Sequence, residues 1–217
     1  DKDGFEGKLY RIAGEKFDLN SEEETDQVVS GIQDEEFKIT KIKEGKRRRN
    51  PSPPFTTSSL QQLASNYLHY STKKTMYLAQ QLYEGIDLGT EGTVGLITYM
   101  RTDSTRISKG AQTNSREYIL NQFGEEYLAS NQDYEADAKA QDAHEAIRPT
   151  SVFRTPEKMK EYLNQEQYKL YKLIWERFVA SQMSPAIYKT LRVNLKTEDE
   201  KYLLRANGSR QLFPGFL

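Results

Sequence analysis

The chain has 217 residues, of which 36% are apolar and 29% are charged, and its formal net charge is −1. This composition is typical of one large or two modest globular domains, and no apolar run approaches the length of a membrane-spanning helix. Cysteine is absent, which excludes disulfides and cysteine-based zinc sites and fits a reducing cytosol.

The first quarter of the chain predicts two short strands and a helix. Lys8 to Ile12 is a strand candidate, and the sequence from Ser21 to Glu24 has the capping-box pattern that begins a helix. Phe37 and Ile39 alternate with polar residues, as expected of a half-buried strand. Three prolines at positions 51, 53 and 54 then exclude a continuing helix or central strand.

Lysine and arginine crowd the segment from Lys38 to Arg49, in which Glu44 is the one acidic residue. Such a run is typical of a solvated loop or an edge strand, and we favour that interpretation. The alternative is a loop that contacts phosphates, because clustered cations gain affinity by releasing counterions from nucleic acid. The net charge of −1 argues against a generic nucleic-acid binder. The run alone does not separate the two interpretations.

The middle of the chain predicts helices. The first begins at Thr57 or Ser58, since Ser58 and Gln61 have capping-box spacing. Apolar residues recur with helical spacing through three further segments. These helices span residues 72–84, 108–123 and 165–183, and a short helix begins at Thr155-Pro156.

A period of two returns after Pro185, in Leu191, Val193 and Leu195, and Asn207-Gly208 predicts a hairpin turn. We therefore predict an α+β fold with two domains. A helical insertion domain, residues 58–185, is carried on a β-strand-rich support domain made of residues 1–57 and 186–217. Proline-rich joints at both crossings suit movement of the insertion as a unit.

A tyrosine surrounded by polar groups follows an apolar stretch in residues 95–104. If this segment is extended, Tyr99 and Arg101 project on the same side. Ionising a phenol at pH 7 costs about 4 kcal/mol, and a nearby guanidinium lowers that cost while gripping a phosphate. The pair is suited to attack a phosphodiester, although with 14 tyrosines in the chain the spacing alone is a weak signal.

A second cluster of chemical interest spans residues 143–150. His144 and Arg148 share a face if the chain forms a helical turn there, and both can donate hydrogen bonds to a phosphate. The simpler interpretation of His144 is a helix-end histidine bonded to a carbonyl. No phosphate-binding glycine loop, dinucleotide fingerprint or metal-ligand spacing is present. The sequence thus offers a nucleophile and cations, and no magnesium site.

The segment around Tyr99, Ile-Thr-Tyr-Met-Arg-Thr-Asp-Ser, resembles the active-site segment of bacterial type IA DNA topoisomerases. Four further segments resemble the same family in the same order. They are residues 54–62, 74–84, 144–149 and 175–183. The resemblance is close from residue 54 onward and looser before it, and five ordered matches are far more specific than one.

The resemblance implies that Tyr99 attacks single-stranded DNA and becomes linked to a 5′ phosphate, which relaxes negative supercoils without ATP. It implies that Arg101 steadies the scissile phosphate and that His144 and Arg148 contact the DNA. Thr98, Thr102 and Asp103 are expected to orient that loop beside the DNA. The β-rich support then corresponds to the arch from which the helical domain lifts.

The acidic metal-binding domain of the family has no counterpart here. We therefore expect Mg²⁺ to bind outside this chain, and we expect the fragment alone to be inactive in cleavage. The expected partners are single-stranded and negatively supercoiled DNA, with no membrane, and the expected state is a cytoplasmic monomer.

Three other interpretations compete with this one. Tyrosine recombinases and type IB topoisomerases place the tyrosine after the other catalytic residues, whereas Tyr99 precedes His144 and Arg148. A non-catalytic single-stranded DNA-binding module would use aromatic residues to stack bases and the basic run to follow phosphates. A purely structural domain would bind no oligonucleotide.

Overall fold

The computed structural model describes residues 4–129 and 144–217. The predicted α+β class is confirmed, with helices and a four-stranded antiparallel sheet. The chain divides into two compact units, Asp1–Arg49 with Ala186–Pro214, and Asn50–Pro185 with Gly215–Leu217. None of the described helices combines the length and the apolar composition that a membrane crossing needs.

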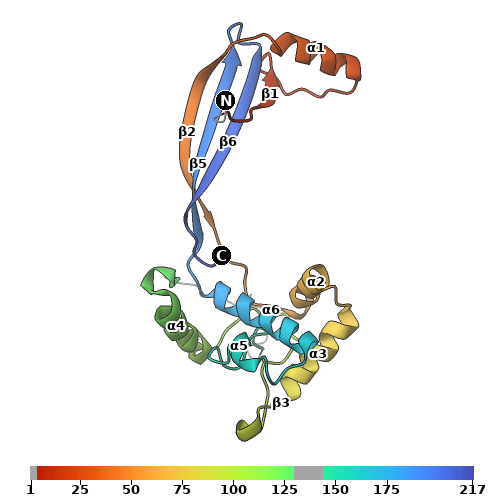
Figure 1. The fold of residues 1–217 in the computed structure, drawn as a ribbon, viewed down its shortest axis with the longest axis vertical. Coiled ribbons are helices and arrows are strands. Elements are labelled where there is room, and N and C mark those ends of the chain that lie inside the picture. The colour runs from red at the N-terminus through yellow and green to blue at the C-terminus, as the bar shows by residue number, and fades with distance from the viewer. Residues whose placement is uncertain (1–3, 130–143) are drawn as a thin grey trace. The chain divides into compact units, whose positions relative to one another are not determined.

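The first unit is a long sheet with one helix (Figure 1). Its strand order is β1-β6-β5-β2, and every neighbouring pair is antiparallel. The elements are β1 (Lys8–Ile12), α1 (Glu22–Ile32), β2 (Phe37–Arg49), β5 (Ala186–Thr197) and β6 (Tyr202–Phe213). The basic run lies in β2, an exposed strand at the edge of this sheet, so the predicted edge strand is confirmed, while phosphate contact by the run stays a prediction.

The hairpin turn predicted at Asn207-Gly208 is wrong. Both residues lie inside β6 and pair with Arg192 and Leu191 of β5. The chain instead turns between Thr197 and Tyr202, where Glu200 has a φ of 59° and the carboxylate of Asp199 accepts hydrogen bonds from the Thr197 hydroxyl and the Lys201 amide. The ladder that continues through both strands decides the position of the turn, and the local Asn-Gly preference does not.

The second unit is helical. Its helices are α2 (Thr57–Leu68), α3 (Thr72–Glu84), α4 (Lys109–Phe123), α5 (Pro156–Met159) and α6 (Gln165–Ser181). Two short strands, β3 (Ile86–Asp87) and β4 (Thr93–Val94), form a small hairpin around the 3-10 turn η1 (Gly89–Glu91), and η2 (Glu125–Tyr127) follows α4. Helices α2, α3 and α6 pack against one another (Figure 1).

Side-chain caps fix the helix starts. Ser71, Ser108 and Asn164 each accept hydrogen bonds from amides in the first turn of α3, α4 and α6. Helix α2 begins at Thr57, one of the two expected starts, and its capping box is formed by Thr56 and Ser59, two residues before the expected box of Ser58 and Gln61. The predicted Ser58–Gln61 box is therefore wrong, because Thr56 already caps the helix.

Two apolar clusters stabilise the helical unit. The larger cluster joins α2, α3 and α6 with the segment that precedes α4, and Phe55, Leu60, Leu96, Tyr171 and Ile174 are among its fully buried members. The smaller cluster joins Ile119 of α4 to Phe178 and Val179 of α6. Because Leu96 and Ile97 belong to the larger cluster, the start of the Tyr99 segment is held in the core.

The packing of the larger cluster predicts the effect of shortening one buried side chain of α6. Ile174 is fully buried, so Ile174→Ala leaves a cavity and lowers the free energy of unfolding of the helical unit by about 2–5 kcal/mol. Lys169→Ala on the exposed face of the same helix is the control and leaves stability nearly unchanged. Chemical denaturation followed by the fluorescence of Trp175 measures both, and equal stabilities would contradict this packing.

Candidate active site

The segment that carries Tyr99 begins in close backbone contact with the end of α3. The Leu96 amide donates to the Leu82 carbonyl at 2.7 Å. A Cβ at Gly95 would lie 2.6 Å from the Tyr83 carbonyl oxygen, so the close approach requires glycine there. Leu96 is fully buried and Ile97 is 1% exposed. The segment therefore enters the site with a fixed direction.

Thr98 ties this segment to residues 146–150. Its amide donates to the Arg148 carbonyl at 2.9 Å, and its hydroxyl donates to the Ala146 carbonyl at 2.7 Å and accepts from the Arg148 amide at 3.0 Å. The Thr150 amide donates to the Leu96 carbonyl at 3.0 Å. We call this set of hydrogen bonds the Thr98 tie. It joins two segments about fifty residues apart in the sequence.

Thr57, at the start of α2, holds the segment on the other side of Tyr99. Its hydroxyl donates to the Met100 carbonyl at 2.7 Å and accepts from the Thr102 amide at 2.9 Å. The Thr102 hydroxyl in turn accepts from the Ser104 amide at 3.1 Å. Because both neighbours of Tyr99 are fixed in this way, the backbone of Tyr99 has little freedom to move.

Tyr99 itself points out of the core. Its side chain is 44% exposed, whereas Met100 is 3% exposed. It borders a hollow of about 370 Å³, the tyrosine hollow, with the other lining residues Tyr83, Thr98, Thr102, His144 and Glu145. Within the described residues the Tyr99 hydroxyl has no hydrogen-bond partner, which leaves it available to a ligand.

The structure brings some of the predicted site residues together and leaves others apart. Thr98, Thr102 and His144 line the tyrosine hollow with Tyr99, but Arg101 and Asp103 do not. Both are exposed, and neither has a hydrogen bond or ion pair with another described residue. No strand includes Tyr99 or Arg101, and the chain bends at Met100 between them, so the side-chain alternation of a strand does not apply to this pair.

Arg148 is engaged inside the protein. Its guanidinium forms an ion pair with Glu145 and donates to the Pro149 carbonyl and to the hydroxyl of Ser108, the N-cap of α4. Its side chain is 11% exposed, and its buried Nε has no partner among the described residues. The chain forms no helical turn at His144 and Arg148, so the shared helical face considered for this pair does not apply, and Ile147 and Pro149 form bridges with Phe55 and Ile97 instead.

Sequence reasoning missed three residues of this site. Thr57 acts through Met100 and Thr102, far away in the sequence, so no local pattern marks it. Glu145 pairs with Arg148 three residues later, a spacing that the sequence itself could have shown. Tyr83 is the second-last residue of α3, two positions before Gly85, and nothing distinguishes it from the other tyrosines of the helical block. No cluster of three carboxylate or histidine side chains that suits a metal ion occurs in residues 4–129 and 144–217.

A second surface of chemical interest lies on the sheet unit. Lys43, Arg192 and Asn207 are paired across β2, β5 and β6, and Gly45, Thr190 and Ser209 form a neighbouring row. With Arg47, which stacks on Tyr188 with 5.0 Å between the guanidinium carbon and the ring centre, they border a depression of about 500 Å³. We call this surface the cationic sheet face.

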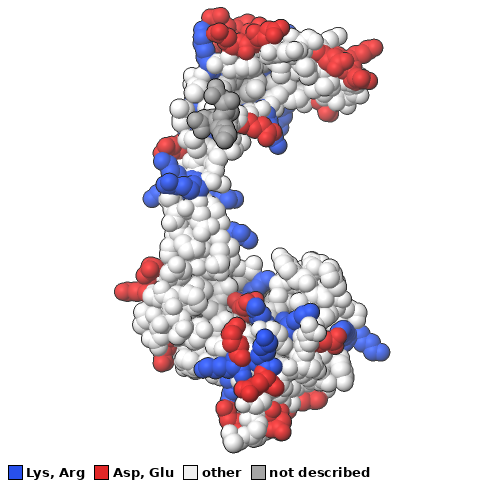
Figure 2. Space-filling model, viewed as in Figure 1, with Lys and Arg blue, Asp and Glu red and all other residues white. Residues whose placement is uncertain are grey.

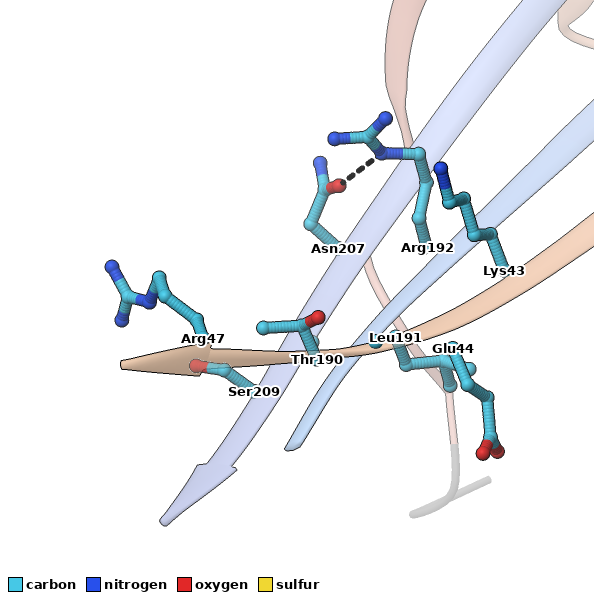
Figure 3. A pocket seen from close by; sticks show the side chains of 10 residues that line it. Lys43, Glu44, Arg47, Thr190, Leu191, Arg192, Asn207 and Ser209 are labelled. Atoms are coloured by element: carbon cyan, nitrogen blue, oxygen red, sulfur yellow. Dashed lines mark hydrogen bonds between the residues drawn. The ribbon is translucent and has the colours of Figure 1, made fainter. Parts of the chain in front are cut away.

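One acidic residue, Glu44, also lines the depression of the cationic sheet face. Figure 3 shows Lys43, Arg47, Arg192 and Asn207 on one side of the strands and Glu44 with Leu191 on the other. Glu44 forms its ion pair there with Lys189. In Figure 2 the Asp and Glu side chains of this unit gather instead near the end that carries α1.

Comparison with known proteins identifies the family. A family model described as DNA topoisomerase matches residues 3–217. Among solved structures, the full-length topoisomerase I from Thermotoga maritima is 41% identical to this chain, with a TM-score of 0.82. The match covers 99% of this chain and 33% of the Thermotoga chain, so the chain spans about a third of that relative's length.

The Thr98 tie predicts a measurable cost for removing one hydroxyl. Thr98→Val keeps the shape but leaves the Ala146 carbonyl and Arg148 amide short of a partner, so it lowers the free energy of unfolding by about 1–3 kcal/mol. It also speeds hydrogen exchange at the Arg148 amide. Thr93→Val is the isosteric control, since Thr93 is exposed and its hydroxyl has no partner among the described residues. Unchanged exchange at Arg148 would contradict the role of the tie.

Proposed function

This chain belongs to the bacterial type IA DNA topoisomerase family, and on that premise we propose that Tyr99 is the nucleophile that breaks one strand of DNA. The observation that carries the proposal is the exposed phenol on an otherwise buried and hydrogen-bonded segment. Apolar burial favours placing a tyrosine ring inside a protein. A fixed backbone that holds this ring 44% exposed at a hollow indicates a role outside the core.

The proposed reaction is an exchange of phosphodiester bonds. The Tyr99 oxygen attacks a backbone phosphorus and loses its proton, the bond to the 3′ oxygen breaks, and that oxygen leaves as a hydroxyl. The strand then remains attached to Tyr99 through its 5′ phosphate. Because one phosphate ester replaces another, the 3′ hydroxyl can reverse the step without ATP. Passage of DNA through the break relaxes negative supercoils.

The neighbouring residues have distinct proposed roles. Arg101 is exposed and lies two residues after Tyr99, so it supplies a cation to the phosphate once DNA is bound. His144 lines the tyrosine hollow and can donate a hydrogen bond to the DNA backbone.

Thr98 and Thr102 act through the hydrogen bonds with backbone groups that fix the Tyr99 segment. Arg148 holds the segment from 144 to 149 against α4, and Asp103 extends the exposed part of the loop.

The described residues do not fit a magnesium ion, because they contain no suitable cluster of ligands. We propose that Mg²⁺ belongs to other segments of the protein and that these 217 residues alone do not cleave DNA. The substrate is negatively supercoiled DNA, whose strands separate readily into single-stranded regions. We further propose that the protein acts as a monomer on cytoplasmic DNA.

The substitution Tyr99→Phe tests the nucleophile. In the natural protein that contains residues 1–217, it removes one hydroxyl and keeps the ring, so covalent adducts and relaxation disappear while affinity for a single-stranded oligonucleotide changes less than about 3-fold. Tyr67→Phe, an exposed tyrosine of α2 outside the hollow, is the matched control and keeps full activity. A Tyr99→Phe protein that still forms adducts would exclude this nucleophile.

A second candidate function is single-stranded DNA binding without cleavage, and the cationic sheet face favours it. Lys43, Arg47 and Arg192 project from the same face of neighbouring strands, where they can pair with successive phosphates. The amide of Asn207 and the ring of Tyr188 add a hydrogen-bonding group and a stacking surface. This activity needs no metal and is therefore open to the chain by itself.

The two faces of the same strands provide a matched test. Replacing Lys43, Arg47 and Arg192 with Ala weakens binding of the chain to single-stranded DNA and lowers the magnitude of its salt slope by about 2. The control replaces Lys46, Arg48 and Lys189, which alternate onto the opposite face and carry the same total charge. Fluorescence anisotropy over a salt series measures both. Equal losses in the two variants would mean that net charge, and not this face, governs binding.

A further inference from the structure

Tyr83 lies in the last turn of α3, three residues before Ile86 begins the β3–β4 hairpin. The helix is held against the core by the buried side chains Thr75, Leu78, Ala79 and Leu82. Tyr83 projects away from this buried face and is 41% exposed. Its position is therefore set by a rigid helix, although its ring belongs to the tyrosine hollow.

The ring of Tyr83 meets the ring of Tyr99. The two ring centres are 5.3 Å apart and the planes are inclined by 64°, an edge-to-face arrangement. Such pairs have a preferred geometry because the positive edge of one ring faces the negative face of the other. In the described part of the chain, this is the one ring contact of Tyr99, and its side chain has no hydrogen bond or ion pair.

The backbone around Tyr99 is fixed by the Thr98 tie and by Thr57, so the remaining freedom of the phenol is rotation about its own side-chain bonds. An exposed tyrosine ordinarily exchanges among several staggered rotamers. The neighbouring Tyr83 ring restricts that exchange and holds the hydroxyl at the hollow. A nucleophile gains rate from such orientation, because attack in line with the leaving oxygen needs one direction of approach.

We propose that Tyr83 is a positioning residue for the reaction, whose ring holds the Tyr99 phenol in the orientation required for cleavage and resealing. This proposal rests on the proposed function of Tyr99. Tyr83 acts through the ring of Tyr99 and does not touch the phosphate. Its own hydroxyl has no partner among the described residues, so the ring is the part that matters.

A base-stacking role for Tyr83 makes a different prediction. A ring that stacks on a base contributes to affinity, and its loss raises the dissociation constant of the DNA. A ring that orients the nucleophile leaves affinity unchanged and lowers the rate of the bound complex. The two roles are separated by measuring affinity and single-turnover rate on the same oligonucleotide.

The experiment uses the natural protein that contains residues 1–217, with Mg²⁺ and a single-stranded oligonucleotide. Tyr83→Leu removes the ring and is expected to lower the single-turnover rate of adduct formation by about 3- to 10-fold, with affinity within about 2-fold. Tyr83→Phe restores the ring and is expected to restore the rate. Tyr77→Leu is the control, because Tyr77 is an exposed residue of the same helix outside the hollow.

A spectroscopic measurement on the chain alone is independent of activity and folding of the larger protein. With 4-fluorophenylalanine at position 99, the ¹⁹F resonance is expected to shift with Tyr83→Leu and not with Tyr77→Leu. The positioning role would be overturned by an unchanged resonance or by a wild-type rate in Tyr83→Leu. It would also be overturned if Tyr83→Leu lost only affinity, or if Tyr83→Phe were as slow as Tyr83→Leu. A wild-type protein without a Tyr99 adduct would overturn the proposed function itself, and the positioning role with it.

Discussion

The site depends on the hydrogen bonds that join the Tyr99 segment to residues 146–150. The Thr98 hydroxyl both donates to Ala146 and accepts from Arg148, so one small side chain satisfies two backbone groups at the edge of the core. Without such partners these groups would be partly buried and unpaired, at a cost of about 1–3 kcal/mol each. Thr57 does the same on the other side of Tyr99 through Met100 and Thr102.

These bonds let a segment without regular secondary structure hold its position. Leu96 and Met100 are buried in the helical unit, and Tyr99 between them is directed outward to the hollow that it shares with His144. The ion pair of Arg148 with Glu145 keeps the second segment in place at the N-cap of α4. In the proposed reaction, the rigid placement of Tyr99 would reduce the reorganisation needed for attack on a phosphate and would let the same phenol break and reseal the bond.

Local patterns predicted the helices because apolar spacing is read within a few residues, as in α3, α4 and α6. They failed where distant pairing decides, since Asn207-Gly208 continues strand β6 and does not form the predicted hairpin turn. The resemblance of the segments pointed to the family, which the comparisons confirm. Tyr83 and Thr57 escaped prediction because each is defined by a partner outside its own helix, whereas the three-residue spacing of Glu145 and Arg148 could have marked that ion pair. The assigned roles of Tyr99, Arg101 and His144 stay predictions.

The most direct measurement identifies the amino acid that becomes bound to DNA. The natural protein that contains these residues is incubated with a single-stranded oligonucleotide, the covalent adduct is trapped with denaturant, and the protease digest is sequenced by mass spectrometry. The account predicts a nucleotide attached to Tyr99 through its 5′ phosphate. A nucleotide on another tyrosine, or a linkage through a 3′ phosphate, would contradict it.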